Sequence, residues 1–171
     1  MTYDRDNIEA IVRKHQAMVF SIAYHFFNNT HIAEEVAQDV FLQLFEKLET
    51  IQSADHLVAW LRRTTSHRCV DAARRKHTYY EIALPNLPEV PDESKESDPL
   101  RDERLRALVA SLPETPRMII VLRYGQDMES TEIAAALNMP VATVRSHLQR
   151  AIGLLREKAS NWLGEVHNGS L

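Results

Sequence analysis

Two stretches of the sequence carry side chains that could hold a nucleic acid. The first, Arg62 to Lys76, reads RRTTSHRCVDAARRK, and Asp71 is its only acid. The second, Pro140 to Arg156, contains no acid and is rich in arginine, hydroxyl, imidazole and amide groups. Guanidinium groups contact phosphates, and all of these donors can also bond to base edges in a major groove. These residue types therefore point to nucleic-acid binding.

The second stretch needs a helix to present those groups on one face. Val141, Val144 and Leu148 begin an apolar seam at steps of three and four, which indicates an amphipathic helix. We expect its polar face to contact DNA through Thr143, Arg145, Ser146, His147, Gln149 and Arg150. A solvated face on an ordinary helical bundle is the alternative.

A second short helix should precede this one. Ile133, Ala134 and Leu137 form its apolar face, and Asn138 can end it in the left-handed conformation. Pro140 suits the start of the next helix because its φ is already fixed. Small residues at Ala134 and Ala135 would let the two helices cross closely, so the pattern predicts a helix-turn-helix.

The rest of the chain is also helical by its pattern, so we expect an all-α fold with two small helical domains. Apolar residues recur at helical spacing from Ile8 to about Lys76, and again from Leu105 to about Lys158. Between them, residues 81–104 contain 3 basic and 8 acidic residues, with four prolines. We expect domains at 1–80 and 105–171, joined by a flexible acidic linker at 81–104.

Composition excludes several classes of protein. Cys69 is the only cysteine, so there is no internal disulfide and no cysteine-based zinc cluster. The N-terminus is charged, and the densest apolar run, Met118 to Leu122, is too short to span a bilayer. We expect a cytoplasmic protein with no membrane insertion. His31 lies near Glu34 and Glu35 but lacks a second histidine, so we expect no metal.

Three blocks in a fixed order resemble a known family. They are IAEEVAQDVFLQLFEKL (32–48), LVAWLRRTTSHRCVDAARRK (57–76) and LPETPRMIIVLRY with the helix-turn-helix that follows (112–156). Together they resemble bacterial extracytoplasmic-function sigma factors. The resemblance implies a protein that binds core RNA polymerase and directs promoter recognition, promoter melting and transcription initiation, with no cofactor and no catalytic site. It also implies a possible anti-sigma partner.

The resemblance assigns a role to each block. The first implies a polymerase-docking helix with an exposed face made of Glu34, Glu35, Gln38 and Asp39; a plain solvated face is the alternative. The second implies a helix and a preceding loop, 49–56, that hold the melted minus-10 strand through Gln52, Ser53, Asp55, His56, Arg62, Arg63, Arg68, Arg74, Arg75 and Lys76. Leu57, Leu61, Trp60 and Val70 should be buried, and we read Trp60 as a core residue.

The third block implies minus-35 recognition by the helix-turn-helix, with three departures from the family pattern. Asn138 stands where the family usually has glycine, Pro140 where it has serine, and His147 where it more often has arginine. The base sequence that is read therefore stays open.

Two interpretations are open for the role of the linker, and two for the function of the protein. The linker acids Glu89, Asp92, Glu93, Glu96 and Asp98 could mimic RNA in a basic polymerase channel, or the segment could be a simple tether. A stand-alone helix-turn-helix regulator is the alternative function. An enzyme is disfavoured because neither a glycine-rich phosphate loop nor a nucleophile pattern stands out.

Overall fold

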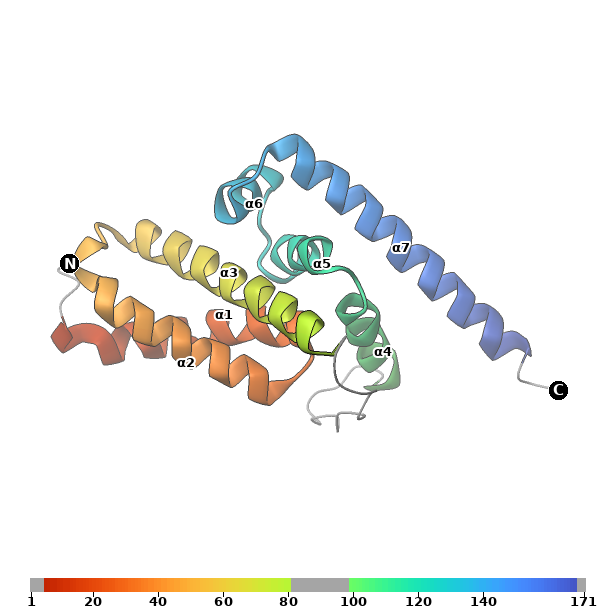
Figure 1. Cartoon of the computed structure of the whole chain (residues 1–171), viewed down its shortest axis with the longest axis horizontal. Helices are drawn as coiled ribbons and strands as arrows, with labels where there is room; N and C mark the ends of the chain where they lie inside the picture. The colour runs from red at the N-terminus through yellow and green to blue at the C-terminus, as the bar shows by residue number, and fades with distance from the viewer. Residues whose placement is uncertain (1–4, 81–98, 169–171) are drawn as a thin grey trace.

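The computed structural model describes residues 5–80 and 99–168, and among them the side chains of 6–75, 102–161 and 164 (Figure 1). All regular structure in these ranges is helical, which confirms the all-α expectation. The expected linker acids Glu89 to Asp98 lie outside the described residues.

The first half is a hairpin of two helices crossed by a third. After a 3₁₀ turn, η1 (Arg5–Asn7), come α1 (Ile8–Phe27), α2 (Thr30–Lys47) and a second 3₁₀ turn, η2 (Leu48–Thr50). The α1–α2 turn is short because Asn28 takes the left-handed conformation, with φ 52°, and Asn29 caps α2 by accepting from the Ile32 N–H at 2.8 Å. The long helix α3 (Ala54–Tyr80) packs on both.

Residues 99–168, the described part of the second half, contain four α-helices. They are α4 (Pro99–Ala110), α5 (Glu114–Ile120), α6 (Ser130–Leu137) and α7 (Val141–Asn168), with a π-helical turn, η3 (Val121–Gly125), after α5. Helical structure resumes at Pro99, six residues before the expected restart at Leu105. Proline is favoured in the first turn, where its missing N–H would be unpaired in any case, and the charged residues that follow hide the apolar period.

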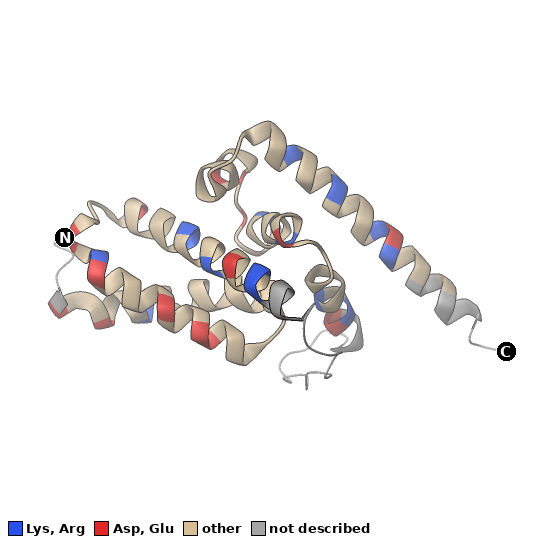
Figure 2. Ribbon diagram, in the orientation of Figure 1, with Lys and Arg blue, Asp and Glu red and all other residues tan. Residues whose placement is uncertain are grey.

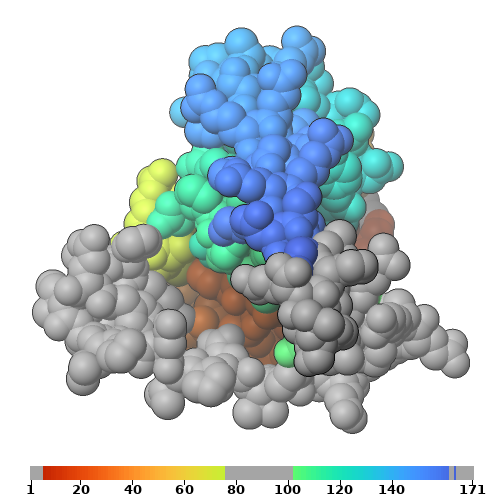
Figure 3. Space-filling model, turned by 90° about the vertical axis from the view of Figure 1, so that its right-hand side faces the viewer, coloured from red at the N-terminus to blue at the C-terminus, as the bar shows by residue number. Residues whose placement is uncertain are grey.

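The two halves do not have separate cores. Phe26 of α1 and Leu61 of α3 belong to the same cluster of buried side chains as Met118, Ile119 and Leu122 of the second half. A smaller cluster joins Leu112, in the turn after α4, to Ile120 of α5 and Ala151 of α7, and Val109 of α4 packs against it. In Figure 3 the green atoms of the second half lie directly against the orange atoms of α1, and contacts of α1 with α4 and of α3 with α5 agree with that view. The sequence did not predict this packing.

Candidate nucleic-acid interface

The helix-turn-helix is built by local hydrogen bonds. Glu129 and Glu132 form a reciprocal capping box that starts α6, in which the Glu132 carboxylate accepts from the Glu129 N–H at 2.7 Å. Asn138 ends α6 at φ 52°, ψ 52°, which confirms the left-handed conformation expected of it. The Pro140 carbonyl then accepts from the Thr143 and Val144 N–H groups at 3.0 and 3.1 Å, and α7 begins.

Only one of the two small residues expected at the crossing of α6 and α7 is buried. Ile133, Ala134 and Val144 are buried, as the pattern predicted, and Ala136 belongs to the same cluster of buried side chains. Ala135 is exposed, so its place at the crossing was wrong. Successive helix positions are about 100° apart, so Ala134 and Ala135 point in clearly different directions; Ala135 and Ala136 line a cleft against α3 instead.

The polar face of α7 is open to solvent in its first three turns. Arg145, Ser146, Gln149 and Arg150 are exposed, and Thr143 and His147 are partly so. Figure 2 shows the arginine bands of α7 before its first acidic band. No ion pair involves Arg145 or Arg150 within the described part of the chain, so both guanidinium groups are available to a ligand.

The loop before α3 is shorter than the range 49–56 predicted for it. Helix α3 starts at Ala54, so Asp55 and His56 lie on its first turn rather than in the loop. Ser53 caps the helix, since its Oγ accepts from the His56 N–H at 3.1 Å, and His56 Nδ1 accepts from the Gln52 N–H at 3.2 Å. Three of the four predicted base-contacting residues thus also stabilise the helix start, and all four are exposed.

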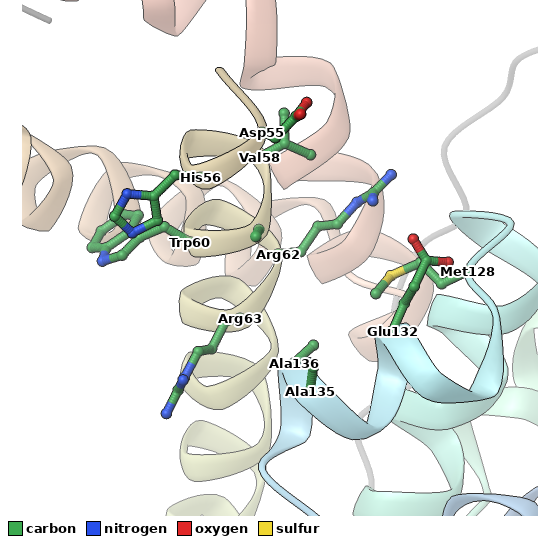
Figure 4. A pocket seen from close by; sticks show the side chains of 11 residues that line it. Asp55, His56, Val58, Trp60, Arg62, Arg63, Met128, Glu132, Ala135 and Ala136 are labelled. Carbon is green, nitrogen blue, oxygen red and sulfur yellow. The ribbon is translucent and has the colours of Figure 1, made fainter. Parts of the chain in front are cut away.

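The basic residues of α3 do not form one continuous stripe. Arg63, Arg74 and Arg75 are exposed, whereas Arg62 and Arg68 are partly buried; the Lys76 side chain lies outside the described set. Figure 4 shows Arg62 directed from α3 toward Glu132 and Met128 of the second half, and its Nε is buried without a hydrogen-bond partner among the described residues.

Arg68 has two partners on α2. Its guanidinium lies 3.6 Å from an Asp39 carboxylate oxygen and donates to the Gln43 carboxamide oxygen at 3.4 Å. A residue expected to grip DNA therefore pairs with one expected to meet polymerase, which sequence spacing could not reveal.

The buried side of α3 is more polar than expected. Leu57 and Leu61 are buried as predicted, Trp60 and Val70 are partly buried against the core, and Cys69, Thr65 and Ser66 are buried as well. The two hydroxyls donate back to the Leu61 and Arg62 carbonyls at 2.6 and 2.7 Å, which satisfies them. Burial raises the pKa of the Cys69 thiol, so it is not a reactive thiolate.

The outer face of α2 joins acids to apolar side chains. Glu34, Glu35, Gln38 and Asp39 are all exposed. Leu42 is 62% exposed and Phe45 40% exposed on the same helix, whereas Val36, Val40 and Leu44 are buried. A groove of about 450 Å³ between α1 and α2 is lined by Phe20, Phe41, Glu34 and Gln38 among others. Sequence reasoning missed this apolar part of the face; the off-stripe position of Leu42 was the available signal.

Two other features bear on function. Within the described residues, His31 lies 3.9 Å from Glu35, and no three His, Cys, Asp or Glu side chains are grouped to hold a metal ion. No helix among the described residues is long and apolar enough to cross a bilayer.

Comparison with known proteins assigns each half of the chain to a known family region. Residues 11–78 match the family described as Sigma-70 region 2, and residues 102–155 match Sigma-70, region 4. RNA polymerase sigma-E factor of Streptomyces coelicolor is 30% identical over 151 residues, which cover 88% of this chain and 84% of that protein. The chain belongs to the sigma-70 family, in its extracytoplasmic-function group. Binding core RNA polymerase and directing it to promoters is the function that this membership gives it.

Other relatives agree. ECF sigma factor SigE of Mycolicibacterium smegmatis is 31% identical over 87% of this chain, which spans only 60% of that relative's length. ECF sigma factor SigW of Bacillus subtilis is 25% identical over 91% of this chain and 90% of its own. The fold matches CnrH, solved with the cytosolic domain of CnrY, at TM-score 0.64 and 20% identity over 92% of this chain and 90% of CnrH. It also matches RpoE of Bartonella quintana, solved with the anti-sigma factor NepR, at TM-score 0.71 and 16% identity over 88% and 95%.

Proposed function

We propose that this sigma factor divides promoter recognition between three surfaces. The exposed face of α2 binds core polymerase, the first half of α3 with Gln52 and Ser53 holds the melted minus-10 strand, and α7 reads the minus-35 element. The observation that carries the proposal is the solvent-exposed polar face at the start of α7, the second helix of the helix-turn-helix, where no acid occurs before Glu157.

The α7 surface suits a major groove. A recognition helix enters that groove with its N-terminal residues nearest the bases, and Thr143, Arg145 and Ser146 occupy the first two turns. Arg145 can bond a guanine through two N–H groups, and the hydroxyl and amide groups near it are donors and acceptors for other base edges.

The α2 surface suits a basic protein partner. Glu34, Glu35, Gln38 and Asp39 supply negative charge and hydrogen-bonding groups, and Leu42 and Phe45 supply apolar area beside them. Interfaces commonly combine an apolar centre with a polar rim. Charge then favours encounter and orientation, while the apolar side chains favour a slow dissociation.

The proposed function also implies a cellular location and a protein partner. We propose that the chain acts in the cytoplasm, where promoter DNA is, and that it catalyses no reaction of its own. An anti-sigma factor would inhibit it by covering the α2 face. The predicted RNA-mimicking role of the acidic linker stays a prediction, because those residues lie outside the described ranges.

Charge reversal on α2 tests the polymerase assignment. The double variant Glu34→Lys, Glu35→Lys should lose most capture of core polymerase in a pull-down, about tenfold or more, because two favourable charges become repulsive. The fold should survive, since both side chains are exposed and such substitutions usually change stability by about 0.5 kcal/mol or less.

A matched control carries the same change in charge elsewhere. Asp6→Lys with Glu9→Lys reverses two exposed acids at the start of α1, outside the proposed face. It should retain capture. If both double variants capture equal amounts of core polymerase, the α2 face is not the polymerase-binding surface.

A further inference from the structure

A cleft of about 580 Å³ lies between α3 and α6 (Figure 4). Val58 and Ala59 line it on α3, Ala135 and Ala136 line it on α6, and the buried Met128 lines it in the turn before α6. These five side chains give the cleft apolar walls. Its volume falls in the range of about 300–1,000 Å³ that is typical of small-molecule sites, so it is large enough for an organic molecule.

Arg62 supplies a positive charge to this cleft and has no partner there. Figure 4 shows its side chain directed from α3 toward Glu132 and Met128, whereas Arg63 points to the opposite side of α3. The Nε of Arg62 is buried without a hydrogen-bond partner among the described residues, and no ion pair within them involves its guanidinium. A buried N–H without a partner is rare because it loses the hydrogen bond that it makes in water. A ligand with an acceptor atom would supply that bond.

The acids that line the cleft limit the charge of such a ligand. The Glu132 carboxylate already accepts from the Glu129 N–H at 2.7 Å, which holds it at the start of α6. Asp55 is exposed at the start of α3. Both acids repel a doubly charged phosphate more strongly than a singly charged carboxylate. One carboxylate can accept two parallel hydrogen bonds from a guanidinium, so a single negative charge matches Arg62.

We propose that the cleft between α3 and α6 binds a small organic monocarboxylate, whose carboxylate pairs with Arg62 and whose apolar body lies between the two helices. Because Arg62 also belongs to the proposed minus-10 surface, the bound carboxylate and the melted strand compete for it. This second part rests on the proposed function of α3. The sigma factor then responds directly to the concentration of a small molecule.

Isothermal titration calorimetry of the free full-length chain tests the site. The probes are sodium octanoate, octan-1-ol and octylammonium chloride, which share an apolar body and differ in the charge of the head group. Octanoate should bind saturably, with a Kd on the order of 1 mM or lower. The alcohol and the amine should bind about tenfold more weakly or less, because neither gives the guanidinium an anionic acceptor. No saturable binding of octanoate, or equal binding of all the probes, would overturn the proposal.

A substitution at Arg62 tests the proposed ion pair. Arg62→Met keeps most of the length of the side chain and removes its charge. Octanoate should then bind about tenfold more weakly or less, which is the usual effect of losing a hydrogen bond to a charged group. The control, Arg156→Met, makes the same change at an exposed position of α7 that does not line the cleft. If both variants bind octanoate equally well, Arg62 does not hold the carboxylate and the proposal is wrong.

A substitution on α6 tests the apolar wall without changing a charged group. Ala135→Leu fills part of the cleft from an exposed helical position where leucine is well tolerated, so the affinity for octanoate should fall severalfold. The control, Ala107→Leu, adds the same side chain at an exposed position of α4 outside the cleft. Circular dichroism checks that both variants are folded. Equal binding of octanoate by the two folded variants would place the ligand outside this cleft and overturn the proposal.

Competition with DNA tests the second part of the proposal separately. The DNA probe is a fluorescent twelve-nucleotide oligo-dT, titrated with the free full-length chain. Octanoate at about ten times its Kd should raise the apparent Kd for oligo-dT about tenfold by mass action, and sodium chloride at the same concentration controls for ionic strength. If octanoate binds through Arg62 but leaves oligo-dT binding unchanged, the competition and the DNA-binding role of Arg62 are wrong, and the ligand site itself is supported.

Discussion

At the residue scale, two arginines on α7 should have different roles in DNA binding. Arg145 should determine base preference, and Arg150 should bind the phosphate backbone whatever the sequence. Arg145 lies in the second turn and Arg150 more than one turn later, and both are exposed. Arg145→Ala should cost about 1–3 kcal/mol at one base pair of the minus-35 element and relax the preference there. Arg150→Ala should weaken all sequences alike and reduce the salt slope by about one phosphate contact.

The measurement is holoenzyme binding to minus-35 elements altered one base at a time, at two salt concentrations. If Arg145→Ala has the same base preferences as the parent protein, Arg145 does not recognise a base. That result would not affect the assignment of the chain to its family.

Arg68 and Asp39 also matter at this scale, because one ion pair joins the two proposed surfaces of region 2. The pair is only partly screened from water, with side chains 39% and 58% exposed, so its contribution to stability is about 1 kcal/mol or less. Its importance is that a polymerase contact to Asp39 would compete with Arg68 for the same carboxylate.

At the scale of elements, the turn between α6 and α7 depends on one left-handed residue. Asn138 has φ 52°, a conformation that costs a residue with a β-carbon about 1–2 kcal/mol unless its side chain compensates. Asn138→Ala should therefore lower the free energy of unfolding by about 1 kcal/mol, and Asn138→Gly should leave it equal or raise it by up to about 1 kcal/mol. Urea denaturation followed by circular dichroism measures both. A more stable alanine variant would contradict this account of the turn.

At the scale of the whole molecule, the shared core couples region 4 to region 2. Ile119 of α5 is fully buried, and Ile119→Ala should destabilise the chain by about 2–5 kcal/mol through lost contacts and a cavity. Because Cys69 of α3 lies in the same cluster, the variant should also speed labelling of this thiol in the native state. Labelling is followed at fixed neutral pH, since burial raises the thiol pKa and the thiolate is the reacting form.

Unchanged labelling of Cys69, in a variant whose helix content melts earlier, would indicate two independently folded halves. The conservative change Ile119→Val provides a control, with an expected loss of only about 0.5–1.5 kcal/mol.

Local features of this protein were determined by the sequence itself. Helical periodicity predicted the elements, Asn138 predicted the left-handed end of α6, and the absence of acids predicted the open polar face of α7. These properties depend on backbone propensity and on side chains within about one or two helical turns, so a reading of neighbouring residues can find them. Element ends were less certain: α3 began before the predicted loop had ended, and α4 began at Pro99.

The relations between distant residues were decided only by the tertiary structure. It turned Ala135 toward α3, paired Arg68 with Asp39, left Leu42 and Phe45 exposed, and joined both halves in one core around Phe26. A periodic pattern states that a helix has an apolar face but not which other face will cover it. That choice depends on the packing of side chains far apart in the chain, where shape and burial decide between partners that look alike in sequence.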